Sequence, residues 1–176
     1  LDKGAYEVIG TAFKHVEACE PWCVGAKAAA EIGVMMLPGE PEKDGKAIGA
    51  GHMAGLQESV DGAGRMLLEL KHQFNLIYPE TDLTDYKVVI LPDRGVVDAR
   101  LEKALKAFLA DGGAVIASHQ ASLQDGGFRC PGLPVRYVGG NPSKPCYLEL
   151  GKELGHGWPS SKFVFYEAST FVKPAT

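Results

Sequence analysis

Four short apolar runs constrain the fold of this chain more than any other feature of its sequence. They cover residues 31–37, 74–78, 87–91 and 114–117, and each is almost entirely apolar rather than alternating between apolar and polar. Strands of this kind are typically buried on both faces, as in a parallel sheet that carries helices on both sides. The first three runs are each followed directly by proline, which ends a strand because it has no N–H to donate.

Segments with helical spacing of apolar residues lie before and between these runs. The spacing predicts helices over residues 6–18, 60–72 and 98–110. Pro21, in the Glu-Pro-Trp sequence at 20–22, is expected to end the first helix. Ser59 or Asp61 is expected to cap the second. Its buried stripe is predicted to contain Val60, Ala63, Leu67, Leu70 and Phe74.

The order strand, helix, strand, strand, helix, strand predicts parallel pairing with right-handed crossovers. The expected fold class is therefore α/β, a flavodoxin-like three-layer sandwich with a mainly parallel sheet and the 31–37 strand at its centre. Residues 39–55 are rich in Gly, Pro and charge and are predicted to form a long loop. Beyond Gly126 the pattern weakens, and residues 147–150 and 163–166 are expected to be two further strands.

Composition excludes several classes of protein. The 176 residues are 45% hydrophobic and 23% charged, which fits one globular domain. The net charge of −4, with no cluster of basic residues, argues against a nucleic-acid partner. The apolar runs fall short of the roughly 20 residues that a membrane span needs. The first residues show no secretory signal, and because the chain starts at Leu1 we expect it to be a fragment or to lack its first residues.

Four cysteines are too few for a disulfide scaffold. Cys19 and Cys23 are close in sequence and would suit a metal, but no second close pair of Cys or His completes a site. Free thiols, no metal and a cytoplasmic location are the favoured interpretation.

Ligands of open α/β sheets bind beyond the carboxyl ends of the strands. The glycine pattern of a dinucleotide site, a phosphate-binding loop and a nucleophile elbow are all missing at these ends. We therefore predict no catalytic, cofactor-binding or metal-binding residue, and whether the chain belongs to an enzyme stays uncertain at this point. Ser118 and His119 follow the last apolar run, where a capping serine and a surface histidine are favoured over a catalytic pair.

Six residues are candidates for a ligand site or an interface. Asp93 and Arg94 could orient a ligand, although a capping carboxylate and a solvated guanidinium are the favoured interpretation. Trp22 and Glu20 could contact a sugar, or Trp22 could anchor packing between domains. Met53, in the expected loop, and His119 complete the set.

The stretch at residues 72–93 (HQFNLIYPETDLTDYKVVILPD) resembles the glutamine amidotransferase-like domain that follows the catalytic barrel of certain glycoside hydrolases. These are the β-galactosidase trimerisation domains, including those of α-L-fucosidases. Residues 62–70 (GAGRMLLEL) and 107–117 (AFLADGGAVIA) are similar to the elements on either side. Weaker similarities are found at 20–22 and 31–34, which resemble the join to the barrel, and at 137–139 and 165–166, which resemble the approach to a C-terminal β-domain. Asn75 departs from the family, whose members often carry Asp there.

The resemblance implies a non-catalytic accessory or oligomerisation domain without the amidotransferase cysteine. Its implied partners are the catalytic barrel of a parent chain and further copies of itself. The implied domain boundaries are 1–30 for a helix and linker after the barrel, 31–155 for the α/β domain, and 156–176 for an edge strand or the start of a β-domain. The alternative is a stand-alone flavodoxin-like protein that binds or hydrolyses a small molecule.

Overall fold

The computed structural model describes residues 3–39, 50–153 and 155–175. Its central feature is a sheet of four parallel strands in the order β2-β1-β3-β4. The strands are β1 (Ile32–Met35), β2 (Phe74–Ile77), β3 (Val88–Leu91) and β4 (Ala114–Ala117). All four predicted strands are confirmed, and β1 lies between β2 and β3 as predicted.

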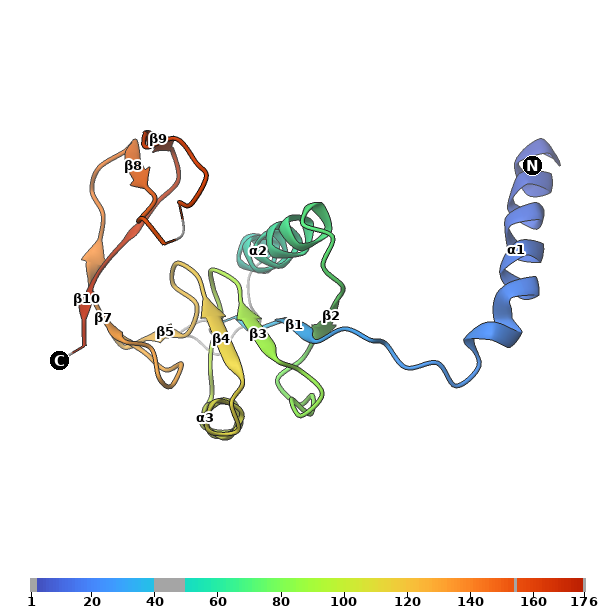
Figure 1. The fold of residues 1–176 in the computed structure, drawn as a ribbon, viewed down its shortest axis with the longest axis horizontal. Helices are drawn as coiled ribbons and strands as arrows, with labels where there is room; N and C mark the ends of the chain where they lie inside the picture. The colour runs from blue at the N-terminus through green and yellow to red at the C-terminus, as the bar shows by residue number, and fades with distance from the viewer. Residues whose placement is uncertain (1–2, 40–49, 154, 176) are drawn as a thin grey trace.

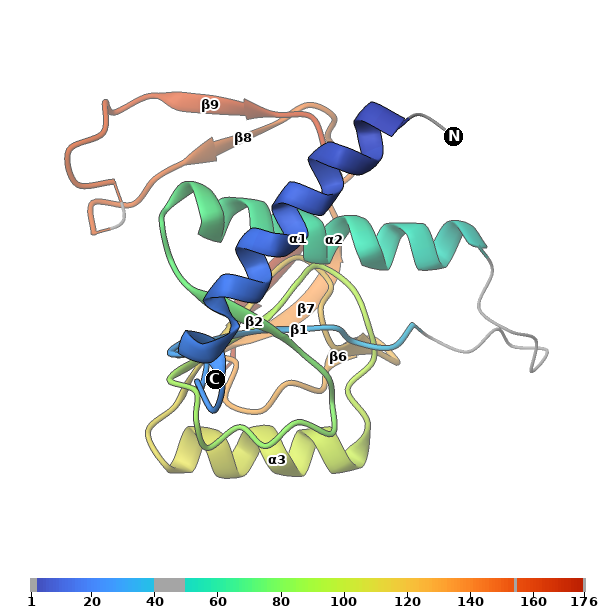
Figure 2. The same ribbon diagram turned by 90° about the vertical axis from the view of Figure 1, so that its right-hand side faces the viewer.

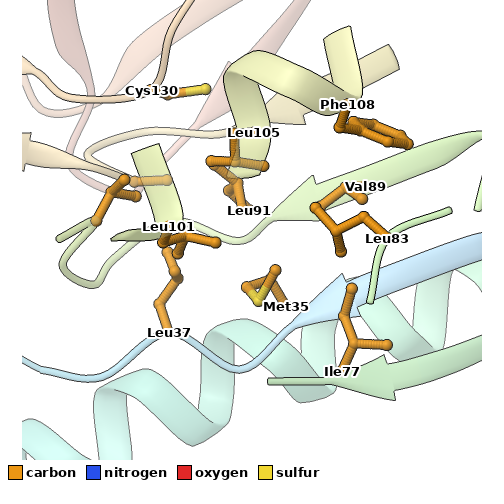
Figure 3. Close-up of a cluster of buried hydrophobic side chains, with 12 residues drawn as sticks. Met35, Leu37, Ile77, Leu83, Val89, Leu91, Leu101, Leu105, Phe108 and Cys130 are labelled. Carbon is orange, nitrogen blue, oxygen red and sulfur yellow. The ribbon is translucent and has the colours of Figure 1, made fainter. Parts of the chain in front are cut away.

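Helices cover both faces of this sheet, which confirms the three-layer α/β fold (Figure 1). On one face, α2 (Ala50–Glu69) buries Val60, Ala63 and Leu67 against Val34. On the other face, α3 (Ala99–Ala110) contributes Leu101, Leu105 and Phe108 to the larger core cluster. Figure 3 shows these side chains meeting those of Met35, Val89 and Leu91 from the sheet.

The ends of α3 follow from its sequence. Asp98 caps the first turn, because its Oδ1 accepts a hydrogen bond of 2.7 Å from the backbone N–H of Leu101. At the other end, Gly112 has a φ of +93° and Gly113 N–H donates to the Phe108 carbonyl over 2.9 Å. The two glycines therefore close the helix.

The predicted end of the first helix is wrong. Helix α1 runs from Lys3 to Cys23 with Pro21 inside it. Proline removes the hydrogen bond of its own nitrogen and its ring crowds the carbonyl four residues earlier, but the Val24 N–H still donates to the Glu20 carbonyl over 3.1 Å. The helix can therefore continue through the proline for part of a turn.

The second helix begins earlier than predicted. Residues 50–55, expected in a loop, are already helical, whereas residues 40–49 of that loop lie outside the described residues. Ser59 and Asp61 consequently do not cap the helix: the Ser59 hydroxyl donates to the Gly55 carbonyl, and Asp61 accepts from Gln57. Leu70 was expected in the buried stripe but follows the last helical residue and is exposed.

Asn75, the departure from the family pattern, lies on the edge strand β2. Its Nδ2 donates to the Tyr86 hydroxyl over 3.1 Å. The amide therefore joins the edge strand to the loop that leads into β3; an ionised Asp at this position could only accept a hydrogen bond from the Tyr86 hydroxyl.

Residues beyond β4 form antiparallel pairs outside the parallel sheet. The predicted strands near 147–150 and 163–166 are confirmed as β8 (Cys146–Glu149) and β9 (Lys162–Phe165), which pair with each other. Two further antiparallel pairs are β5 (Leu123–Gln124) with β6 (Gly127–Phe128), and β7 (Val135–Gly140) with β10 (Thr170–Pro174). The described residues thus form three two-stranded sheets besides the parallel sheet.

Helix α1 stands away from the rest of the chain, at the end of an extended segment (Figure 1), and in the view of Figure 2 it lies in front of α2. None of its described residues is buried. Within the described part of the chain, no helix has both the length and the apolar character needed to cross a bilayer.

Candidate functional site

Asp93 and Ser118 are bonded to each other at the carboxyl ends of β3 and β4. The Ser118 hydroxyl accepts from the Asp93 backbone N–H at 2.9 Å and donates to Asp93 Oδ1 at 2.7 Å. Asp93 has a φ of +28°, a conformation that few non-glycine residues adopt. The Asp93 carboxylate thus accepts a hydrogen bond from a serine hydroxyl, whereas the sequence suggested that it would accept from backbone N–H groups. This bond holds one of the two carboxylate oxygens in a fixed position.

His119 links the end of β4 to the last strand of the chain. Its Nδ1 lies 3.1 Å from the Thr170 hydroxyl on β10, with the donor set by the tautomer of the ring. The φ of His119 is +49°, so two neighbouring strand ends, at Asp93 and at His119, carry non-glycine residues in the left-handed region. Such positions are frequent at ligand sites, where the surrounding structure holds them in place.

A cavity of about 770 Å³ opens between these strand ends, helix α2 and the C-terminal strands. We call it the carboxyl-edge cavity. Its polar and charged lining residues are Glu58, Ser59, Asp93, Arg94, Ser118, His119, Glu167, Ser169 and Thr170. Its apolar lining includes Phe128, Leu133 and Phe165. The volume falls in the range of roughly 300–1,000 Å³ that is usual for small-molecule sites.

The charged groups of this cavity are not neutralised by one another. Three salt bridges occur among the described residues, and none includes Arg94, Glu58 or Glu167. The Arg94 guanidinium lies against Gly55 of α2, where a Cβ would be 3.0 Å from its Nη1. The glycine therefore leaves room for the guanidinium beside the helix.

The structure brings together three of the six candidate residues. Asp93, Arg94 and His119 line the carboxyl-edge cavity. Glu20 and Trp22 lie on α1, where Trp22 is 86% exposed, and belong to a separate surface. Met53 lies in α2, but its side chain is outside the described residues.

The sequence did not predict the cavity residues that come from elements other than the ends of β3 and β4. Glu58 and Ser59 were missed because α2 was predicted to start too late. Glu167 and Thr170 were missed because they reach the cavity through the pairing of β10 with β7, across about thirty residues of chain. The β-branched and aromatic residues at 170–172, Thr-Phe-Val, are a strand signal that could have pointed to this pairing.

The four cysteines are free thiols in the structure. The described residues contain no group of three or more His, Cys, Asp or Glu side chains arranged to hold a metal ion. Cys19 Sγ lies 3.9 Å from His15 Nε2, one turn earlier on α1.

Burial raises the pKa of the Cys130 thiol to about 11. This side chain packs in the core cluster beneath α3. A thiol with so high a pKa is protonated at neutral pH and is a poor nucleophile. Cys130 is therefore a structural residue.

Comparison with known proteins gives a family for the central part of the chain. Residues 63–135 match the family described as the β-galactosidase trimerisation domain. No curated protein sequence matches the chain. Among solved structures, the α-L-fucosidase isoenzyme 2 from Paenibacillus thiaminolyticus is 33% identical over 99% of this chain, with a TM-score of 0.74.

A second structure shares the fold. The β-galactosidase from Bacillus circulans sp. alkalophilus matches 85% of this chain at 17% identity, with a TM-score of 0.59. The chain spans about a quarter of the length of each enzyme, 26% of the fucosidase and 24% of the β-galactosidase. The matched residues 63–135 contain the last turns of α2 together with β2, β3, α3 and β4 of the parallel sheet. Residues 63–135 therefore match the β-galactosidase trimerisation family, within a chain that is similar over nearly its whole length to one part of an α-L-fucosidase.

Proposed function

We propose that this chain is the accessory, oligomer-forming region of a glycoside hydrolase of the α-L-fucosidase or β-galactosidase type. In this proposal the catalytic carboxylates belong to another region of the parent protein. The division of the chain follows: residues 1–30 join the α/β domain to the catalytic barrel, 31–155 form that domain, and 156–176 lead toward a further β-region.

The match to the fucosidase carries the proposal. A similarity of 33% identity that covers 99% of this chain and only 26% of the other chain is what a part of a larger enzyme would give. A stand-alone flavodoxin-like enzyme, the alternative from sequence, would be expected to match proteins of its own length. No observation favours that alternative.

Helix α1 supports the proposal independently of the comparisons. Tyr6, Ile9, Phe13 and Val16 recur at intervals of three and four residues, so they share one face of the helix, and all four are exposed. Trp22 is exposed in its last turn. Aromatic and aliphatic side chains gathered on a helix face are typical of the buried centre of an interface, and we assign this face to the contact with the catalytic barrel.

Two measurements test the proposal. Analytical ultracentrifugation of the parent protein should give an oligomer, and the same protein without residues 1–176 should show a smaller assembly. A parent protein that keeps its oligomeric state after this deletion would overturn the assignment. So would a reading frame that encodes no catalytic region beside this chain.

The contact through α1 has its own test. Phe13→Ala should weaken binding of this chain to the separately expressed catalytic region by about 2 kcal/mol, as is typical of interface hot spots. Thr11→Ala, on the opposite face of the same helix, is the matched control and should leave the affinity unchanged. Isothermal titration calorimetry measures both variants. Equal effects of Phe13→Ala and Thr11→Ala would contradict the assignment of the apolar face.

A further inference from the structure

The carboxyl-edge cavity is distinct from the surfaces that the proposed function uses. It lies inside the α/β domain and its C-terminal strands, whereas the proposed contact with the barrel is on α1. We propose that this cavity is a binding site for a neutral sugar, taken up as one monosaccharide unit. The choice of sugars for the test rests on the proposed function, but the cavity itself does not.

The position of the cavity fits a ligand site. In sheets of this topology, ligands bind in the crevice beyond the carboxyl ends of the strands. Here β3 and β4 end in Asp93 and His119, and each of these residues has a positive φ. The bond from Ser118 to Asp93 and the contact from His119 to Thr170 hold the two strand ends before any ligand binds. A preorganised site of this kind loses little conformational entropy on binding.

The charges disfavour an anionic ligand and suit one that carries many hydroxyl groups. Glu58, Asp93 and Glu167 supply three carboxylates, and Arg94 supplies one guanidinium. The excess of carboxylates disfavours a phosphate or another anion. Sugar hydroxyls both donate and accept, so they can donate to the carboxylates and accept from the guanidinium.

The apolar part of the lining completes the recognition. Phe165 lines the cavity and is 43% exposed, so part of its ring is open to a ligand. Phe128 also lines the cavity and makes an edge-to-face contact with Tyr137, with ring centroids 6.4 Å apart. Sugars present apolar C–H faces as well as hydroxyls, and an aromatic ring beside hydrogen-bonding groups matches both.

The test is titration of the 176-residue chain with L-fucose, D-galactose and D-galacturonate, followed by saturation-transfer NMR and calorimetry. We expect a neutral sugar to bind and Arg94→Met to weaken that binding by roughly tenfold or more, because hydrogen bonds to a charged group are lost. Arg65→Met, which removes an exposed guanidinium from α2 outside the cavity, is the matched control and should not change it. Circular dichroism shows whether each variant is folded.

Three outcomes would overturn the proposal: no binding of either neutral sugar, tighter binding of the galacturonate, or equal affinity in Arg94→Met and the unaltered chain. If Arg94→Met does not fold, Glu167→Gln, on the exposed C-terminal segment, replaces it in the same comparison of sugar affinities. The measurement is independent of assembly, since a chain that binds sugar as a monomer would support the cavity while contradicting the oligomerisation role.

Discussion

Gly95 is the residue at which backbone conformation and packing most clearly require glycine. Its φ is +117°, and a Cβ there would overlap the Leu37 side chain and lie 3.2 Å from the Pro38 carbonyl oxygen. We expect Gly95→Ala to lower the free energy of unfolding by about 3 kcal/mol, from backbone strain together with overpacking. Denaturant titration followed by circular dichroism measures the loss.

Gly112 provides the matched control, because its φ of +93° is also left-handed but a Cβ there would meet open space. Gly112→Ala should cost only the backbone strain, about 1 kcal/mol. Equal losses at the two positions would show that the contact with Leu37 is unimportant.

Cys130 gives a pH dependence with a definite sign. Its pKa is about 11 in the folded chain, compared with a reference value of 9.0, because burial disfavours the thiolate. The folded chain therefore holds this proton more tightly than the unfolded chain does. The contribution of the protonated Cys130 thiol to the stability of the folded chain is fully present below pH 9 and is lost as the pH rises toward 11.

The comparison of Cys130→Ala with the unaltered chain isolates this contribution from the lysines and tyrosines that titrate in the same range. The difference in unfolding free energy between the two should shrink between pH 9 and pH 11. In parallel, alkylation at pH 8 should modify the exposed Cys23 long before Cys130. Modification of both thiols at the same rate would contradict the assigned burial.

At the scale of elements, α1 and α3 form a natural comparison. Helix α1 has 21 residues and none of them is buried, whereas α3 has 12 residues, of which three are buried, and a capping Asp98. Isolated helices are marginally stable in water, so tertiary packing decides their protection. We predict that amide hydrogens of α1 exchange much faster than those of α3, despite the greater length of α1.

Hydrogen exchange with mass spectrometry measures both helices in one experiment. Addition of the separately expressed catalytic region should slow exchange in α1 and leave α3 unchanged. Equal protection of the two helices in the chain alone would mean that α1 is stabilised by contacts within the chain.

The elements also show which parts of the structure were predictable from sequence. The four parallel strands and α3 carry their signals locally, as an apolar run that proline closes in three of the four strands, or as a periodic stripe of apolar residues, and these were predicted correctly. The start of α2 was not predicted correctly, because Gly51 and Gly55 have low helix propensity and favoured the prediction of a loop at these residues. The pair β7 and β10 depends on contacts between residues 135–140 and 170–174, which leave little local signal.

The candidate site, like the fold, was predictable only in part. Asp93, Arg94 and His119 could be placed at one edge of the sheet, because the carboxyl ends of parallel strands meet there. The other half of the cavity could not be placed, since Glu58 depends on the true start of α2 and Thr170 depends on the pairing of β10.

For the molecule as a whole, the position of β1 has a consequence for how the chain folds. Ile32 pairs with Phe74 on one side and with Val88 on the other. The strand that becomes most enclosed is therefore made early during synthesis, and neither of its neighbours exists until 40 or more further residues have followed. Contacts this distant in sequence make folding slow. Until α3 leaves the ribosome, the face of β1 that carries Met35 has no helix to cover it, and this interval is when the nascent chain most needs protection from aggregation by a chaperone.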